Sequence, residues 1–372
     1  MCRNLLILLL ATIISFLLAE TTTRIFLAKR IVLYPRYHTD ATYGEFRIRR
    51  LRPNAKFWHT SVDGSWEFKT NAQGFRDVHD YTYAKPPGTI RVIVLGDSQT
   101  LGFEVRQGRT YSEVIENYLN RHDMKVEVLN TGVSGFSTAE ELIFLENEGI
   151  RYNPDVLVLG FYANDLEDNV KADLFRLEDG HLILNGREHL PGVTILNVHN
   201  NFRLLRWLSE NSYFYSALMN AIWNTAKQRL YTSKRTELVT EYAIALNKNS
   251  DYQIQLQARL IERMYTFCRN RKIELVILDI PQLQGKYINS SVPSTLEPVF
   301  VRNSDVFISS ETLLGTYPDA TDVFVPNGQQ HISEFTHLML GLAVSKAIQL
   351  RRVTRSRSGN DQALLLSHHD TH

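Results

Sequence analysis

The sequence predicts a three-layer α/β/α fold in which a parallel β-sheet is covered by helices on both faces. From about residue 89 onwards, short apolar runs alternate with longer segments of helical periodicity. This alternation is typical of βαβ units, and wholly apolar runs are typical of strands buried on both faces. A chain of 372 residues with 44% hydrophobic side chains can bury the core that such a domain needs.

The first thirty residues are predicted to be a membrane anchor. Residues 5–19 form the uncharged run LLILLLATIISFLLA, which is longer than needed for a signal-peptide core but shorter than the roughly 20 residues of a full span. Its last residues, Leu-Leu-Ala, place a bulky residue where signal cleavage prefers a small one. We expect an uncleaved anchor over residues 1–30 with the bulk of the chain outside the cytoplasm. The alternative is a cleaved signal, which would give a secreted or periplasmic protein. Arg24, Lys29 and Arg30 follow the apolar run, and the positive-inside rule would place them, with the bulk of the chain, in the cytoplasm, which opposes the expected export.

Residues 31–88 are predicted to be an irregular, aromatic-rich lead-in packed on the domain. Four prolines and two turn signals interrupt it: Pro35, Pro53, Pro86, Pro87, Asp63-Gly64 and Gln73-Gly74. The main domain is predicted over residues 89–352. Its strands are expected at Val92–Leu95, Val126–Leu129, Val156–Leu159 and Ile273–Leu278, with a last strand near Val323–Val325. Its helices are expected at Tyr111–Leu119, Ala139–Leu145, Ile254–Phe267 and Leu338–Leu350.

Residues 165–250 interrupt the alternation and are predicted to form an inserted lid or subdomain. The segment is turn-rich around Asp179-Gly180 and helical from Phe202 to Leu230. Residues 353–372 are predicted to be a flexible tail, because the histidines at its end have no apolar surroundings.

Charge and cysteine content exclude several classes of protein. The formal net charge is +1, so there is no basic surface of the kind that binds nucleic acid. Cys2 and Cys268 are the only cysteines, which excludes a disulfide framework and a thiolate metal cluster. Cys268 lies in an apolar helical pattern and is predicted to be a core residue.

The corner Gly96-Asp97-Ser98 follows the first predicted strand directly. Open α/β sheets bind ligands at the carboxyl ends of their strands, so Ser98 is a candidate nucleophile. The residues after it could begin a helix whose amide groups favour an anion. The alternative is that Asp97 and Ser98 only cap that helix.

Three further blocks end predicted strands or precede the last helix: Asn130–Gly135, Gly160–Asp165 and His331–His337. With Gly96-Asp97-Ser98 they resemble, in order, the blocks of the SGNH hydrolases, the GDSL esterase and lipase family, over Arg91–Leu350 with a gap at the insertion. The resemblance implies a flavodoxin-like fold and a serine esterase.

Each block of the resemblance implies one role in the site. Ser98 would be the nucleophile and His331 the general base. The oxyanion hole would consist of the backbone amides of Ser98 and Gly135 and the side-chain amide of Asn164. For His337, beside Leu338 and Leu340, we expect packing or hydrogen bonding rather than catalysis.

These residue types suit ester chemistry. A serine hydroxyl needs a base to take its proton, and fixed donors stabilise the charge that develops on the ester oxygen, each by about 3 kcal/mol. The scheme requires no metal and no organic cofactor.

One position departs from the family pattern. The family places an aspartate three residues before its histidine, and here that residue is Gly328. In serine proteases the acid contributes about four orders of magnitude to the rate. Asn327, Asp322 or Asp319 could supply the support, or a backbone carbonyl could hold the ring of His331 and leave a dyad with Ser98.

The expected function is hydrolysis of a carboxylic ester through a Ser98 acyl-enzyme, acting on a small ester or an acylated glycan and removing acetyl or other short acyl groups. One alternative is an O-acyltransferase acting on a cell-surface glycan. Another is a degenerate protein that binds glycans or assists their assembly, with aromatic side chains stacked on sugar rings: Trp207, Tyr213, Phe214, Tyr215 and Trp223.

Overall fold

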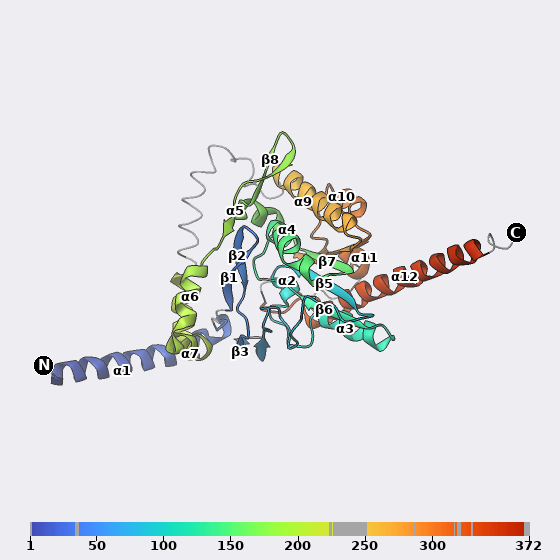
Figure 1. Cartoon of the computed structure of the whole chain (residues 1–372). Helices are drawn as coiled ribbons and strands as arrows, with labels where there is room; N and C mark the ends of the chain where they lie inside the picture. The colour runs from blue at the N-terminus through green and yellow to red at the C-terminus, as the bar shows by residue number, and fades with distance from the viewer. Residues whose placement is uncertain are drawn as a thin grey trace.

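A five-stranded parallel sheet forms the centre of the protein (Figure 1). The computed structural model describes residues 2–33, 37–222, 225, 251–285, 287–315, 317, 321–328 and 330–367. The strands lie in the order β6-β5-β7-β11-β14. Their bounds are β5 Ile90–Gly96, β6 Val126–Asn130, β7 Val156–Phe161, β11 Glu274–Asp279 and β14 Val306–Ile308. Numbered along the chain, this is the order 2-1-3-4-5 of flavodoxin-like folds, as predicted.

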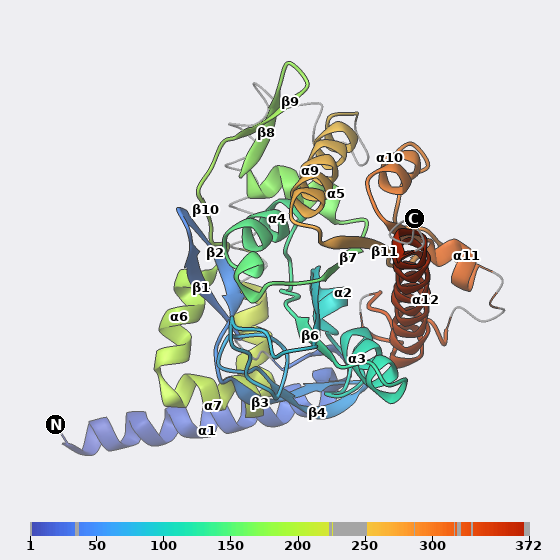
Figure 2. The ribbon, with the colours of Figure 1, turned by 45° about the vertical axis from the view of Figure 1, so that its right-hand side comes forward.

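Helices cover both faces of this sheet (Figure 2). Helices α3 (Tyr111–Arg121) and α12 (Glu334–Ser367) pack on one face, and α4 (Thr138–Asn147), α9 (Asp251–Asn270) and α10 (Glu297–Arg302) lie on the other. Strand β5 shows how the layers form: Val92 and Val94 enter the core beside α3, and Ile93 and Leu95 enter the core beside α4. All four are at most 1% exposed. Burying one such side chain stabilises the fold by about 1.5–3 kcal/mol.

The prediction of the last strand was wrong. Strand β14 completes the sheet, whereas Phe324 forms only an isolated bridge with Ile332 outside it. Strand β14 has only three residues, all half-buried, so it lacks the long apolar run that identified the other strands. The remaining short elements are η2 (Gly149–Tyr152), β12 (Gln282–Gln284), β13 (Tyr287–Asn289) and α11 (Ser310–Leu314).

The last helix is longer than the sequence predicted. It begins at Glu334 and continues to Ser367, beyond the predicted tail boundary at residue 353. Residues 351–367 contain no proline and one glycine, so nothing in their composition ends the helix. Residues 368–372, with the terminal histidines, lie outside the described residues.

The lead-in is regular, which corrects the expectation for residues 31–88. It contains two antiparallel hairpins, β1 (His38–Tyr43) with β2 (Phe46–Leu51) and β3 (Lys56–Ser61) with β4 (Gly64–Lys69). Phe57 and Phe68 are directly opposite each other on β3 and β4, and their rings stack with centroids 4.9 Å apart. Cross-strand aromatic pairs of this kind stabilise hairpins whose strands carry few aliphatic residues.

The insertion contains regular elements tied to the lead-in. It begins with α5 (Asp165–Ala172), which packs on α9, and continues as the hairpin β8 (Phe175–Glu178) and β9 (His181–Leu184). Strand β10 (Glu188–His189) pairs in parallel with β2. Helices α6 (Val193–Asn201) and α7 (Arg203–Asn211) and a helical segment over residues 213–222 follow. The rest of the predicted insertion, residue 225 excepted, lies outside the described residues.

Helix α1 (Cys2–Leu27), followed by the 3-10 turn η1 (Ala28–Arg30), projects from the domain (Figure 1). Residues 3–30 are long and apolar enough to cross a membrane, although a signal sequence passes the same test. The carboxylate of Glu20 accepts hydrogen bonds from the Ser212 hydroxyl at 2.7 Å and from the backbone amides of Tyr213 and Phe214 at 3.1 and 2.9 Å. The C-terminal part of α1 is therefore attached to the insertion.

Candidate active site

A tight corner places Ser98 at the carboxyl end of β5. Helix α2 (Ser98–Leu101) starts immediately after the strand, and the Asp97 carboxylate accepts a hydrogen bond from the Gln99 amide at 2.8 Å. Gly96 has a φ of +154°, and a Cβ there would lie 1.9 Å from Oγ1 of Thr100. Only glycine fits this corner. Asp97 therefore caps the helix, as the capping alternative predicted, whereas Ser98 is the first residue of the helix itself.

Ser98 and His331 lie together. Their Oγ and Nε2 atoms are 2.8 Å apart, and Nδ1 of His331 bonds to the carbonyl oxygen of Gly328. A carbonyl can only accept, so Nδ1 carries the proton of the neutral ring and the Nε2 lone pair faces the hydroxyl. Burial lowers the pKa of His331 below its usual value, although the Gly328 carbonyl and the charge of Glu104 act to raise it. At neutral pH the ring can accept the serine proton.

Gln99 fixes the loop that carries His331. Its Oε1 accepts a hydrogen bond from the amide of Ile332 at 3.0 Å, and its Nε2 donates to the carbonyl of Gln330 at 3.3 Å. Gln99 therefore holds the backbone on both sides of His331, at Gln330 and at Ile332. Gln99 was not predicted as a site residue, because its position beside Ser98 is its only signal in the sequence.

The structure distinguishes among the proposed supports for His331. Asn327 is directed away, because its Nδ2 donates to the Asp63 carboxylate at 2.9 Å. The exposed Asp322 has its carboxylate 3.5 Å from the Tyr317 hydroxyl. Asp319 lies outside the described residues. The remaining alternative was a backbone carbonyl, and the Nδ1 atom of His331 does bond to the carbonyl oxygen of Gly328.

Asn164 lies next to the corner, but its amide is occupied. Its Nδ2 donates to the carboxylates of Asp97 at 3.2 Å and Asp168 at 3.0 Å. Its buried Oδ1 has no hydrogen-bond partner among the described residues. Both amide hydrogens therefore point at carboxylates, and donation to an ester oxygen requires one of them to turn away.

Gly135 lies in the loop between β6 and α4 with a φ of +78°. Its carbonyl accepts a hydrogen bond from the Arg49 guanidinium, which is also 3.3 Å from Oε1 of Glu140. A Cβ at Gly135 would lie 2.9 Å from Nη1 of Arg49. Strand β2 of the lead-in thus fixes the loop that carries the expected oxyanion donor. Arg49 was not predicted as a site residue, because the segment that contains it was expected to be irregular.

Buried carboxyl groups lie behind the corner. Asp97, Glu141 and Asp165 are each at most 1% exposed, and neither oxygen of Glu141 has a hydrogen-bond partner among the described residues. Burial raises the pKa of Asp97 to about 6, and burial together with mutual repulsion raises the pKa values of Glu141 and Asp165 well above their usual range. Burial and mutual repulsion therefore disfavour the charged forms of Glu141 and Asp165 beside the site.

Two other predictions are confirmed. The buried His337 accepts a hydrogen bond at Nδ1 from the Tyr111 amide at 3.0 Å and stacks on the Tyr111 ring. Burial lowers its pKa to about 3, so the ring is neutral and structural. Cys268 is fully buried in the core.

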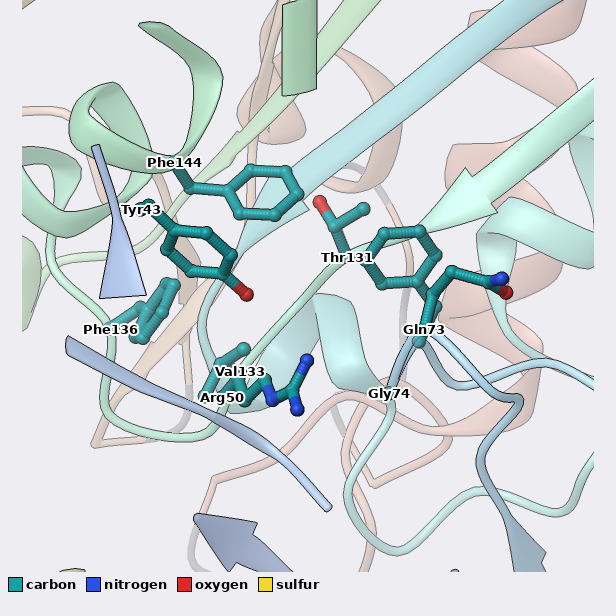
Figure 3. Close-up of a pocket in the computed structure, with 9 residues that line it drawn as sticks. Tyr43, Arg50, Gln73, Gly74, Thr131, Val133, Phe136 and Phe144 are labelled. Atoms are coloured by element: carbon teal, nitrogen blue, oxygen red, sulfur yellow. The ribbon is translucent and has the colours of Figure 1, made fainter. Parts of the chain in front are cut away.

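A small pocket lies beside the loop that carries Gly135. Figure 3 shows the Tyr43 hydroxyl and the Arg50 guanidinium directed into the same space. Neither Ser98 nor His331 lines it. The lining residues are Tyr43, Arg50, Gln73, Gly74, Phe75, Thr131, Val133, Phe136 and Phe144.

Two aromatic side chains of the insertion contact α1, whereas Tyr215 contacts the ring of His199. Phe214 packs edge-on against Phe16 with centroids 5.8 Å apart, and the Arg24 guanidinium lies 4.9 Å from the Tyr213 ring. Trp207 is 59% exposed, and Trp223 lies outside the described residues.

No family model matches the chain, and no curated protein matches its sequence. Its structure is similar to those of GDSL lipases and other esterases. A lipase/acylhydrolase from Enterococcus faecalis is 14% identical, with 70% of this chain and 96% of that chain covered and a TM-score of 0.39. A GDSL-like lipase from Bacteroides thetaiotaomicron is 12% identical, with 70% and 88% covered and a TM-score of 0.34. A mutant of an acetyl-xylooligosaccharide esterase from Geobacillus is 10% identical, with 69% and 93% covered and a TM-score of 0.38. The likeness is one of fold and says nothing about the substrate.

Proposed function

We propose that the chain is a serine esterase in which Ser98 attacks a carboxylic ester and His331 moves the proton. The observation that carries this proposal is the 2.8 Å contact between Ser98 Oγ and His331 Nε2, with Nδ1 bonded to a carbonyl. That pairing leaves a neutral imidazole ready to deprotonate the hydroxyl.

The reaction has two halves. The Ser98 oxygen forms a bond to the carbonyl carbon of the ester while its proton passes to Nε2 of His331, and the π electrons of the C=O bond move to the carbonyl oxygen. The tetrahedral intermediate then collapses, the alkoxide takes the proton from His331, and an acyl-serine remains. A water molecule then gives a proton to Nε2 of His331 and its oxygen bonds to the acyl carbon. The second tetrahedral intermediate collapses, the bond between that carbon and the Ser98 oxygen breaks, and the serine oxygen takes the proton back from His331 as the acid is released.

The developing oxyanion needs donors. The backbone amide of Ser98 opens α2, and the loop of Gly135 is fixed by Arg49. These two amides are the proposed permanent donors. Asn164 is the proposed third donor and would exchange one carboxylate partner for the oxyanion.

The proposed substrates are acetyl or other short acyl esters of carbohydrates or other small alcohols, with acyl transfer to a cell-surface glycan as the alternative outcome of the same acyl-enzyme. This substrate class rests on the family resemblance and on a location at the membrane surface. The attachment of Glu20 to the insertion favours α1 as an uncleaved anchor. The exposed apolar side chains of α7 beside that attachment, Leu204 and Trp207, fit the same location.

A second candidate is a protein that binds glycans without turning them over. Two observations favour it: Gly328 stands where the family has its acid, and both amide hydrogens of Asn164 are taken by carboxylates.

A fluorophosphonate probe distinguishes the two candidates. The purified full chain in detergent should be labelled, and Ser98→Ala should abolish labelling, while the exposed Ser294→Ala should retain it. Folded wild-type protein that takes up no probe would contradict the esterase. Incubation with an acetylated glycan and an acceptor glycan then separates release of free acetate from transfer.

A further inference from the structure

The carbonyl of Gly328 orients His331 but carries no full negative charge. The imidazolium that forms during ester attack therefore lacks the usual acid. A carboxylate is nevertheless present in this region: it belongs to Glu104, in the turn that follows α2, and its charge acts to raise the pKa of His331.

Glu104 occupies the space beside Gly328. Its Cγ lies 3.4 Å from the point where a Cβ at residue 328 would be, and that Cβ would also be 2.6 Å from Cβ of Val325. Phe103, the residue before Glu104, contacts two histidines: its ring centroid is 4.8 Å from that of His331 and 4.9 Å from that of His59. The side chain of Glu104, from another loop, thus lies next to the position where the SGNH hydrolases carry their aspartate.

The carboxylate of Glu104 is buried and held in place. Its side chain is 1% exposed, its Oε1 lies 3.1 Å from Nε2 of His59, and its Oε2 accepts a hydrogen bond from the Ser61 hydroxyl at 2.8 Å. Burial acts to raise the pKa of Glu104, but His59, Ser61 and His331 outweigh it and lower the pKa below its usual value. The group is therefore ionised at neutral pH.

The backbone of Glu104 also indicates a specific placement. Its φ of +64° lies in the left-handed region, which residues other than glycine adopt infrequently. Such conformations persist where the surrounding structure holds them, and they are enriched at functional sites.

We propose that Glu104 is the positioning residue that replaces the missing acid: its carboxylate, held by His59 and Ser61 of the β3–β4 hairpin, stabilises the protonated form of His331 during ester hydrolysis. The proposal rests on the proposed esterase function. It assigns a role in the active site to the lead-in, which contributes both partners of the carboxylate.

The other titratable groups around His331 do not take this role. His337, on α12, is neutral at working pH because burial lowers its pKa to about 3. Glu334, at the start of α12, is paired with Arg106 at 2.5 Å. Asp63 accepts the hydrogen bonds of Asn327. His59 lies against Glu104, and a charge on His59 acts to lower the pKa of His331, which is opposite to the proposed role.

The test compares Glu104→Gln with Glu104→Asp and with Glu116→Gln, a control that removes a half-buried carboxyl group on α3. The pH profile of kcat/KM for p-nitrophenyl acetate is measured for each full-length protein. Glu104→Gln should lower the plateau about tenfold or more and move the acid limb to lower pH, because loss of the negative charge makes His331 harder to protonate. Glu104→Asp should keep the limb near the wild-type position, and Glu116→Gln should change neither feature.

A role limited to structure would lower the plateau without moving the limb, so a folded Glu104→Gln protein with an unmoved limb overturns the proposal. If that variant does not fold, Ser61→Ala provides the test, since Ser61 is bonded to the carboxylate of Glu104. A roughly twofold to fivefold lower kcat/KM with a shifted limb supports the proposal, and a wild-type profile overturns it. Wild-type protein that neither hydrolyses esters nor takes up the fluorophosphonate refutes the esterase itself, which is a different outcome.

Discussion

His331 donates its Nδ1 proton to the backbone carbonyl of Gly328, three residues earlier in the chain. This contact sets the tautomer of the ring and aims Nε2 at the Ser98 hydroxyl, 2.8 Å away. Orientation and charge stabilisation, which a single aspartate combines in serine proteases, are therefore separable here.

The pH dependence of hydrolysis follows from the state of His331. The base works in its neutral form, and its pKa lies below the usual value of about 6.5. Activity should be constant at neutral pH and fall as pH drops through a midpoint below about 6.5. Measurement of kcat/KM from pH 4 to pH 9 checks this. An acid midpoint above about 7 would contradict the proposed environment of the ring.

Restoring an acid at Gly328 should not improve the enzyme. In Gly328→Asp the new Cβ would lie 2.6 Å from Cβ of Val325, so the loop must move. We expect a loss of about 1–3 kcal/mol in the free energy of unfolding and no gain in kcat. Urea unfolding followed by tryptophan fluorescence, with an ester assay, measures both. A variant that is as stable as wild type and faster would show that the loop accommodates the side chain.

Gln99→Ala should separate catalysis from folding. It removes both hydrogen bonds that hold the backbone beside His331, so the ring loses its alignment with Ser98. We expect kcat/KM to fall about 10–100-fold and probe labelling to slow in proportion. Gln282→Ala is the matched control, because Gln282 also donates to a backbone carbonyl, that of Ser290, but lies on β12. Equal effects of the two substitutions would exclude a specific role for Gln99.

Substitutions of Asn164 and of its partner Asp168 should affect kcat differently. Asn164→Ala removes the proposed third oxyanion donor and should lower kcat about 100-fold or more. Asp168→Asn weakens the competition for the Asn164 amide and removes a negative charge near the developing oxyanion, so kcat should be unchanged or higher. Steady-state kinetics with one acetyl ester measure both. Wild-type kcat in Asn164→Ala would remove Asn164 from the proposed mechanism.

His337 should make stability depend on pH. Its pKa is about 3 in the folded protein and about 6.5 when unfolded, so the unfolded state binds more protons between these values. The stabilisation is complete above pH 6.5 and is lost as pH falls towards 3, at up to about 1.4 kcal/mol per pH unit. His337→Asn keeps an acceptor for the Tyr111 amide without this titration. Its unfolding free energy should therefore fall less steeply between pH 7 and pH 4 than that of wild type, and parallel curves would contradict the assignment.

The sequence predicted those parts of the fold and the site that leave a local pattern, such as an apolar run followed by polar residues. Apolar runs identified four of the five central strands, and the polar residues at their ends lie together because parallel strands end at one edge of the sheet. Gln99, Arg49 and Glu104 left no such signal, since each acts through contacts with segments distant in the chain. Strands β1–β4 were missed because their stability depends on cross-strand pairs such as Phe57 with Phe68, and not on a continuous apolar run.

The hydrogen bonds between Glu20 and the start of the 213–222 helical segment have a mechanical consequence. A flexible tether would let a domain sample a wide volume above a bilayer, but a helix that is hydrogen-bonded to the domain restricts the height and tilt of that domain. If α1 spans a membrane, the Ser98 hydroxyl works at a constant distance from the lipid headgroups. The distance of an ester bond from the headgroups would then help to decide whether Ser98 can reach it.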